Sequence, residues 1–150
     1  MKKIIYIVLL LLLISSCSTG YDNARLIAGD SCQFWFWPTA DSIVKAKFYI
    51  YFNRKGKMFL LKERFHNKEI SLYDGGDVAY YPKWSLKNDS IITWFGRDRK
   101  LSVINDTVIV TKDEEWQCVD TLYKVTDTSL LKKLQEVKIP RNQFNHRDRF

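Results

Sequence analysis

The side chains that could catalyse a reaction or bind a metal are few and widely separated in this sequence. The two histidines, His66 and His146, lie far apart, which excludes a His-Glu-x-x-His motif and most zinc sites. Glycine-rich phosphate loops and the serine-hydrolase motif do not occur either. The acidic run Asp113-Glu114-Glu115 lacks the spaced carboxylates that supply the roughly six to eight oxygen ligands of calcium, and it indicates a solvated turn. We expect no enzymatic activity, no cofactor and no metal site.

The N-terminal segment predicts export and a lipid anchor. Lys2 and Lys3 precede an apolar run, 4–14, which is shorter than the roughly 20 residues needed to cross a membrane. The run ends in Ile14-Ser15-Ser16-Cys17, and these four residues resemble the lipobox of bacterial lipoproteins. The resemblance implies that 1–16 is a signal peptide and that Cys17 receives lipid on its sulfur and an acyl chain such as palmitate on its amino group. An ordinary signal peptide, cleaved near Ser18-Thr19-Gly20, is the alternative.

The same resemblance implies a location in the bacterial cell envelope. In this family an aspartate directly after the lipid-bearing cysteine favours the inner membrane, whereas this chain has Ser18. We therefore expect an anchor in the outer membrane rather than the inner, with the protein facing the periplasm or the cell surface. Small and polar residues predict a tether over 17–30, followed by one domain over 31–139 and a basic tail over 140–150.

Charge and composition limit the class of protein. The 150-residue chain has a net charge of +7, and without 1–16 the count of basic side chains falls from 24 to 22 against 17 acidic ones, a net +5. An exported protein of this modest charge is not expected to bind nucleic acid. A hydrophobic content of 46% excludes disorder, collagen and a coiled coil.

Alternating apolar residues predict a mainly β domain. Ala46, Phe48, Ile50 and Phe52 share one parity, and the sequence from 53 to 57 contains the glycine of a hairpin turn. Similar runs and turns predict eight or nine short strands in an antiparallel barrel or sandwich. The expected strands are 32–37, 44–52, 59–65, 70–72, 78–86, 90–95, 100–104, 107–111 and 116–125.

One helix is expected at the C-terminal end of the domain. Asp127 or Thr128 can cap its first turn, and Pro140 marks its end. Its apolar face consists of Leu130, Leu131, Leu134 and Val137.

Two hairpin sequences are similar to those of the small lipocalin-like lipoproteins of bacteria. They are Trp84-Ser-Leu-Lys-Asn-Asp-Ser-Ile-Ile and Leu101-Ser-Val-Ile-Asn-Asp-Thr-Val-Ile-Val. Together with the lipobox and the meander, they imply a lipocalin-like barrel. The first strand, Phe34-Trp35-Phe36-Trp37, lacks the glycine-x-tryptophan of lipocalins, which leaves open whether the sheet closes around a cavity.

The remaining cysteines, Cys32 and Cys118, are candidates for a disulfide. The envelope is oxidising, and Cys32 opens the first expected strand while Cys118 lies in the last. Because the first and last strands of a closed barrel are neighbours, a disulfide between them is expected if their Cα atoms lie within about 7 Å. Two unpaired thiols are the alternative.

Aromatic side chains give the one further indication of a binding site. Trp35 and Trp37 share one face of the first expected strand, and Tyr49 and Tyr51 lie opposite the apolar face of the second. Core packing explains many aromatic residues in strands, but both faces of these two strands carry them. The candidate contacts for a ligand or a partner are Trp35, Trp37, Tyr49, Tyr51, Trp84 and Trp94.

Two functions follow as hypotheses. The favoured one is a lipid-anchored, non-enzymatic envelope lipoprotein that binds a small apolar or amphipathic ligand inside a lipocalin-like barrel, which needs a central pocket of about 300–1,000 Å³. The alternative is a structural or assembly lipoprotein that acts through contacts with another envelope protein. That alternative predicts a filled interior and an exposed aromatic patch.

Overall fold

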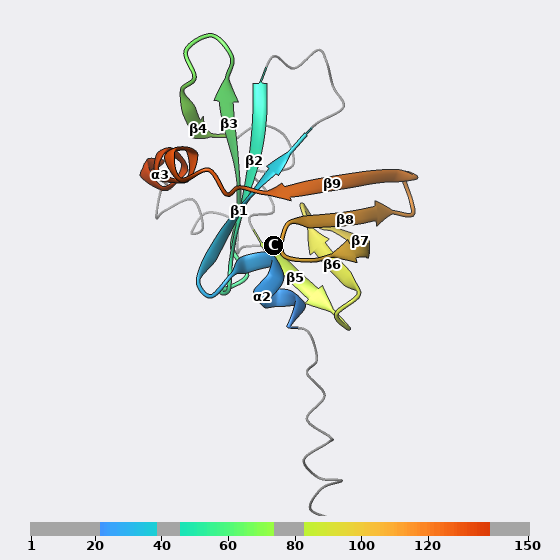
Figure 1. The fold of residues 1–150 in the computed structure, drawn as a ribbon. Coiled ribbons are helices and arrows are strands. Elements are labelled where there is room, and N and C mark those ends of the chain that lie inside the picture. The colour runs from blue at the N-terminus through green and yellow to red at the C-terminus, as the bar shows by residue number, and fades with distance from the viewer. Residues whose placement is uncertain (1–21, 39–45, 74–82, 139–150) are drawn as a thin grey trace, which may run out of the picture.

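The fold is mainly β, as the sequence predicts, and consists of nine antiparallel strands in one curled, half-barrel sheet with two short helices (Figure 1). The computed structural model describes residues 22–38, 46–73 and 83–138. The strands are β1 (Cys32–Trp37), β2 (Ala46–Asn53), β3 (Met58–Arg64), β4 (Ile70–Leu72), β5 (Trp84–Lys87), β6 (Ile91–Trp94), β7 (Arg97–Ile104), β8 (Val108–Asp113) and β9 (Cys118–Lys124). The helices are α2 (Asn23–Ala28) and α3 (Thr128–Glu136).

The strands form an up-and-down meander that opens between β4 and β5. Their order in the sheet is β4-β3-β2-β1-β9-β8-β7-β6-β5, so strands that follow each other in the chain are paired except β4 and β5, and β1 pairs with β9. At one end, β5 meets the β2–β3 turn: the amide of Trp84 donates to Gly56 O at 2.8 Å. Gly56 has φ +74, and a Cβ there would lie 3.1 Å from Trp84 O. This contact therefore requires glycine.

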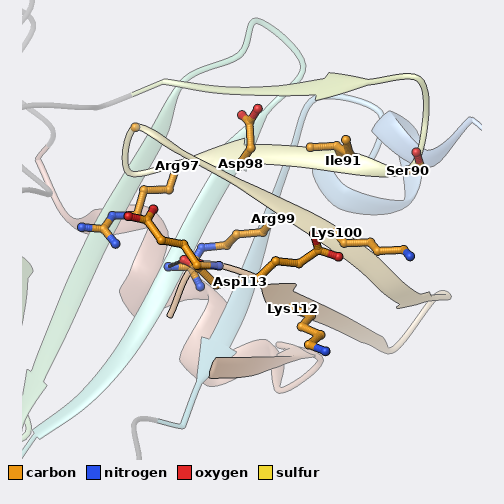
Figure 2. A pocket seen from close by; sticks show the side chains of 11 residues that line it. Ser90, Ile91, Arg97, Asp98, Arg99, Lys100, Lys112 and Asp113 are labelled. Carbon is orange, nitrogen blue, oxygen red and sulfur yellow. Dashed lines mark hydrogen bonds and ion pairs between the residues drawn. The ribbon is translucent and has the colours of Figure 1, made fainter. Parts of the chain in front are cut away.

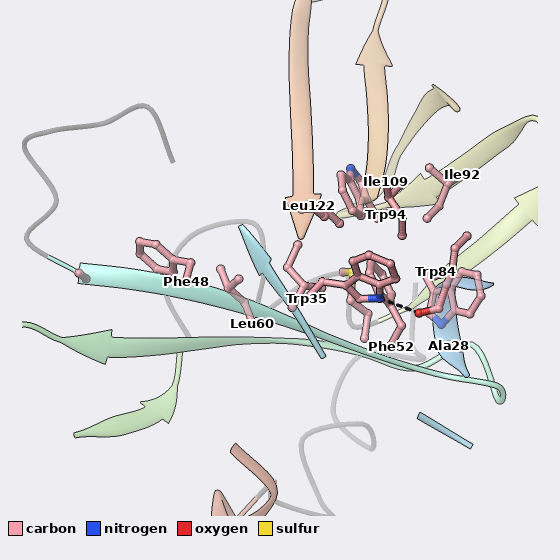
Figure 3. Close-up of a cluster of buried hydrophobic side chains, with 14 residues drawn as sticks. Ala28, Trp35, Phe48, Phe52, Leu60, Trp84, Ile92, Trp94, Ile109 and Leu122 are labelled. Carbon is pink, nitrogen blue, oxygen red and sulfur yellow. Dashed lines mark hydrogen bonds between the residues drawn. The ribbon is translucent and has the colours of Figure 1, made fainter. Parts of the chain in front are cut away.

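The inner face of the sheet is filled by one cluster of buried side chains, which we call the inner cluster (Figure 3). Both halves of the sheet contribute, because strands with a period of two place every second side chain on the concave face. Figure 3 shows Trp35, Phe52 and Trp84 facing Ile92, Trp94 and Ile109. The cluster consists of Ile27, Ala28, Trp35, Ala46, Phe48, Ile50, Phe52, Met58, Leu60, Trp84, Ile92, Trp94, Ile109 and Leu122.

Helix α3 covers the other face of the N-terminal strands. Of the two predicted caps, Asp127 is the one used: its carboxylate accepts a hydrogen bond from the amide of Leu130 at 2.8 Å. Its buried residue Leu134 packs in a second cluster with Phe34, Tyr49, Leu61 and Val125. The predicted apolar face of the helix is confirmed, and the helix ends at Glu136. Figure 1 shows α3 beside β2–β4, away from β7 and β8.

Helix α2 was not expected, because its residues fall in the segment predicted to be a tether. Asp22 caps the helix through the amide of Arg25, and the guanidinium of Arg54 binds the Asp22 carboxylate at 2.9 Å. The hydrogen bond from Arg54 lowers the pKa of Asp22. Ile27 and Ala28 are fully buried in the inner cluster. A six-residue helix has too short a periodic pattern to be seen in the sequence, and its burial depends on the sheet it packs against.

Strand β7 begins three residues earlier than predicted. The sequence 96–99 was expected to form the turn before this strand, but the turn consists of Phe95 and Gly96, which both have positive φ, +48 and +74. A two-residue hairpin of this kind places Trp94 opposite Arg97. Arg97, Asp98 and Arg99 consequently lie in the strand. Of the expected strand 78–86, only 83–86 belong to the described residues. Lys83 forms an isolated antiparallel bridge with Lys57, and Trp84 begins β5.

Candidate functional site

The predicted disulfide between Cys32 and Cys118 is wrong, since both cysteines are free. Strands β1 and β9 do lie side by side, as expected, with Trp35 opposite Lys124. Continuing this register places Cys32 opposite Asp127, nine residues along the chain from Cys118. At about 3.3 Å per residue, that offset is about 30 Å, far beyond the reach of a disulfide. Cys17 lies outside the described residues.

The four candidate tryptophans point to the inner face, where they fill space instead of lining a cavity. Trp35 and Trp94 are fully buried, Trp84 is nearly so, and Trp37 packs against the same cluster. The indole N–H of Trp35 donates to Ile27 O at 2.7 Å, and that of Trp84 donates to Asn53 O at 2.9 Å. The described inner face is thus packed by its own side chains, and an apolar ligand there would have to displace them.

The candidate tyrosines lie on the opposite face, in the cluster under α3. Tyr49 is buried and donates its hydroxyl to Glu63 at 2.7 Å. Tyr51 is half-buried and contacts Phe34 and Phe59, with ring centroids 5.2 and 5.6 Å away. The predicted aromatic site is therefore two separate groups, the tryptophans on the inner face and the tyrosines under α3. Core packing accounts for the two tyrosines.

Alkaline pH is expected to destabilise the fold through Tyr49. Burial, and then the hydrogen bond to Glu63, raise the pKa of Tyr49 above its ordinary value of 10.0. Below pH 10.0 the tyrosine is protonated in both the folded and the unfolded state, and the full stability is present. Above pH 10.0 it ionises in the unfolded state first, so the free energy of unfolding falls by at most about 1.4 kcal/mol per pH unit. Urea unfolding between about pH 8 and pH 11 measures this slope. Tyr49→Phe should reduce the slope of the free energy of unfolding against pH, whereas Tyr123→Phe, at an exposed position, should not. Equal slopes in the two variants would show that Tyr49 is not the source of the pH dependence.

A polar cluster interrupts the inner face at β7, β8 and β9. Arg99, with a side chain 11% exposed, forms an ion pair with Asp120 and a longer one of 3.9 Å with Asp113. Asp120 also accepts a hydrogen bond from the indole of Trp37 at 3.0 Å. The guanidinium lies 5.2 Å from the ring centroid of Trp94. Three strands thus bring together charged residues that are separate in the sequence.

Around this polar cluster, three buried polar atoms have no hydrogen-bond partner among the described residues. They are Trp94 Nε1, Arg99 Nε and Thr111 Oγ1. Thr111 is directly opposite Asp120 across β8 and β9. Buried polar atoms in folded proteins nearly always have a partner, so three in one neighbourhood indicate a place where water or a ligand completes the hydrogen bonding.

The outer face of β7–β9 exposes several apolar side chains. Val103, Val119 and Tyr123 are 45%, 60% and 46% exposed, and Trp116, in the turn after β8, is 63% exposed. The register makes these residues neighbours, because Val103 pairs with Val110 and Val108 pairs with Tyr123. We define the β7–β9 outer face as Val103, Val108, Val110, Val119 and Tyr123. Trp116 is not part of it, because its ring lies against the guanidinium of Arg97, which pairs with buried Trp94.

A groove of about 530 Å³ lies at one end of these strands (Figure 2). It runs between the β6–β7 turn, the end of β8 and the β8–β9 turn, and Arg99 and Asp113 are among its lining residues. Among the described residues, no group of three or more His, Cys, Asp or Glu side chains could hold a metal ion. Neither described helix is long and apolar enough to cross a membrane.

No family model matches the chain, and neither the curated proteins nor the solved structures contain a significant match.

Sequence reasoning missed Arg99, Asp120 and Thr111. Arg99 was placed in a turn, and the other two were taken as ordinary strand residues. A signal was present, since Asp113, Thr111 and Asp120 have the strand parity of buried Ile109 and Leu122. Polar residues on a buried parity require partners, and this argument could have singled them out.

Proposed function

We propose that this protein is a lipid-anchored, non-enzymatic envelope lipoprotein that acts by binding another envelope protein. The observation that carries the proposal is the contrast between the two faces of β7–β9, one packed and the other exposing valine and tyrosine side chains. Exposed apolar patches of this kind mark interaction sites. The anchor at Cys17 and the position in the outer membrane rest on the sequence Ile14-Ser15-Ser16-Cys17 and on Ser18.

The charges around this face favour a partner with acidic groups. Lys100 and Lys112 are exposed and directly opposite each other in β7 and β8, and Lys112 is opposite Val119. Like charges directly opposite in a sheet are destabilising, and neither lysine has an ion pair with the described residues. Carboxylates on a partner would offset this repulsion. The proposed partner therefore has an apolar surface bordered by aspartate or glutamate.

Site-directed photocrosslinking in the bacterium tests the proposal. A photoreactive amino acid at Val119 should capture one defined partner, and the same amino acid at Ser85, exposed on β5, should not. Lys100→Glu and Lys112→Glu should each reduce the Val119 product, because they repel acidic groups. Val119→Asp should abolish the interaction with little effect on stability, since the side chain is 60% exposed.

Three results would contradict the proposal. One is the same set of products from Val119 and Ser85. Another is a Val119 product unaffected by both lysine reversals, because the partner would then lack the acidic border. The third is a crosslinked product that consists of two copies of this chain. The surface would then mediate self-association and not the binding of another protein.

A further inference from the structure

The described part of the chain begins beside the turn between β2 and β3. This turn carries Arg54, whose guanidinium binds the carboxylate of Asp22 at 2.9 Å. The amide of Arg54 also donates to Ser31 O at 3.1 Å. Figure 1 shows α2 and this turn at one end of the sheet, with the β3–β4 turn at the other end. The chain that leads back to Cys17 therefore leaves the described domain at the end formed by the β2–β3 turn.

The length of that chain limits the distance between this end and a lipid anchor. Five peptide units join Cys17 to Asp22, and an extended chain spans at most about 3.6 Å per residue. With lipid on Cys17, Asp22 lies within about 18 Å of the anchoring residue. Strand β3 alone is about 20 Å long, at about 3.3 Å per residue. The β2–β3 turn can therefore reach the lipid head groups, whereas the β3–β4 turn lies at the far end of the sheet.

Exposed positive charges gather at this end. Asn53 shapes the turn, because its side-chain oxygen accepts hydrogen bonds from the amides of Lys55 and Lys57 at 3.0 and 2.9 Å. Lys57 forms an isolated antiparallel bridge with Lys83, which directly precedes β5. We define the anchor-end surface as Asp22, Arg54, Lys55, Lys57 and Lys83, all of them exposed. It contains four basic side chains and one acidic one, a net charge of +3.

The other acidic groups described at this end lie around α2 instead of at the turn. Asp30 forms an ion pair with Arg25 at 2.8 Å. Asp89 and Asp106 lie in the β5–β6 and β7–β8 turns, beside Asn23 of α2. The positive charge is therefore concentrated on the β2–β3 turn and Lys83.

We infer that the anchor-end surface docks on the anionic head groups of the bilayer that holds the lipid anchor. Lysine and arginine side chains close to a membrane attract its anionic lipids, and a basic surface next to a lipid chain acts as a second attachment. The inference rests on the anchor proposed above and adds which end of the domain contacts the membrane and which lipids it prefers. The domain then has a fixed orientation on the bilayer. The β7–β9 outer face shares no residue with the anchor-end surface.

Photocrosslinking in vesicles tests which end of the domain contacts lipid. The lipidated protein, purified in detergent from bacterial membranes, carries a photoreactive amino acid either at Lys55 or at Lys68, which is exposed in the β3–β4 turn. Each form is reconstituted into vesicles of phosphatidylcholine, alone or with about 30% phosphatidylglycerol. Mass spectrometry measures the amount of lipid adduct.

The adduct is expected at the anchor end and is expected to depend on charge. Position 55 should give at least about fivefold more phosphatidylglycerol adduct than position 68. Raising the salt concentration to about 0.5 M should reduce the adduct from position 55 at least about twofold, because salt screens exposed charges. In vesicles of phosphatidylcholine alone, position 55 should give less lipid adduct than in the anionic vesicles.

Two matched double variants assign the contact to the anchor-end surface. Lys57→Gln/Lys83→Gln neutralises two of its exposed lysines and should reduce the adduct from position 55 by about threefold or more. Arg64→Gln/Lys68→Gln neutralises two exposed basic side chains at the β3–β4 turn and should leave that adduct unchanged. Urea unfolding checks that both variants are folded, and the dependence on lipid and salt is measured without them.

Three results would overturn the inference. They are equal adducts from positions 55 and 68, an adduct that responds to neither phosphatidylglycerol nor salt, and an adduct unchanged in Lys57→Gln/Lys83→Gln. Mass spectrometry of the N-terminal peptide separates this inference from the proposed anchor. A protein without lipid on Cys17 would overturn both, whereas a lipidated protein that gives no adduct at position 55 would overturn this inference alone.

Discussion

Replacing Trp35 by alanine is expected to lower the free energy of unfolding by about 3–5 kcal/mol. Trp35 is fully buried in the inner cluster, where α2 and strands from both halves of the sheet surround it. Its removal leaves a cavity that the packed strands cannot close, and Ile27 O loses its hydrogen bond from the indole. A domain of this size has a total stability of about 5–15 kcal/mol, so the loss is a large share of it.

Urea unfolding followed by circular dichroism measures this effect. Trp116→Ala is the matched control, because Trp116 is 63% exposed and contacts the Arg97 guanidinium at 3.9 Å from its ring centroid. Such an exposed cation–π contact contributes about 0.5–1 kcal/mol. Equal losses in the two variants would mean that the inner cluster is not the core of the protein. The same result would restore a ligand-filled interior as a hypothesis.

Asp120→Ala is expected to have a comparable effect, of about 3–5 kcal/mol. The substitution leaves the buried guanidinium of Arg99 without its closest carboxylate and the indole N–H of Trp37 without its acceptor. Removing one member of a largely buried pair leaves the desolvation cost of the other charge without compensation from its partner. Differential scanning calorimetry and urea unfolding both report this loss.

Two further variants separate the ion pair from its surroundings. Asp98→Ala removes a carboxylate whose ion pair with Lys87 is half-exposed, and solvent screening should make its effect much smaller. The double variant Arg99→Met/Asp120→Leu should be more stable than Asp120→Ala alone, since no unpaired charge remains at that pair. If the free energy of unfolding lost in the double variant equals the sum of the losses in Arg99→Met and Asp120→Leu, the two side chains do not interact.

The faces of individual elements could be predicted from the sequence because they depend on local periodicity. In β2, the alternation of Ala46, Phe48, Ile50 and Phe52 correctly identified the residues that enter the inner cluster, but the expectation of a single buried face was wrong, because Tyr49 on the other face is buried under α3. In α3, the apolar stripe was predicted, and Asp127 was one of the two predicted caps. A period of two or of 3.6 residues needs no knowledge of the partner element.

Register could not be predicted, and the errors in the candidate site follow from it. Neighbouring strands were expected to bring Cys32 and Cys118 together, but the β1–β9 register separates them. Register depends on turn lengths and bulges, such as the irregularity between Leu101 and Val103 in β7, which also turns Val103 outwards. These features act over several strands and leave little trace in a single run of residues.

The sequence by itself determined the mainly β meander, the faces of β2 and α3, and the motif that predicts a lipid anchor at Cys17. The tertiary structure alone decided that the inner face is filled, that Arg99 meets Asp113 and Asp120, and that α3 leaves the outer face of β7–β9 uncovered. The reason is physical. Secondary-structure periodicity is written in adjacent residues, whereas packing and charge pairing depend on which distant strands the curled sheet brings together.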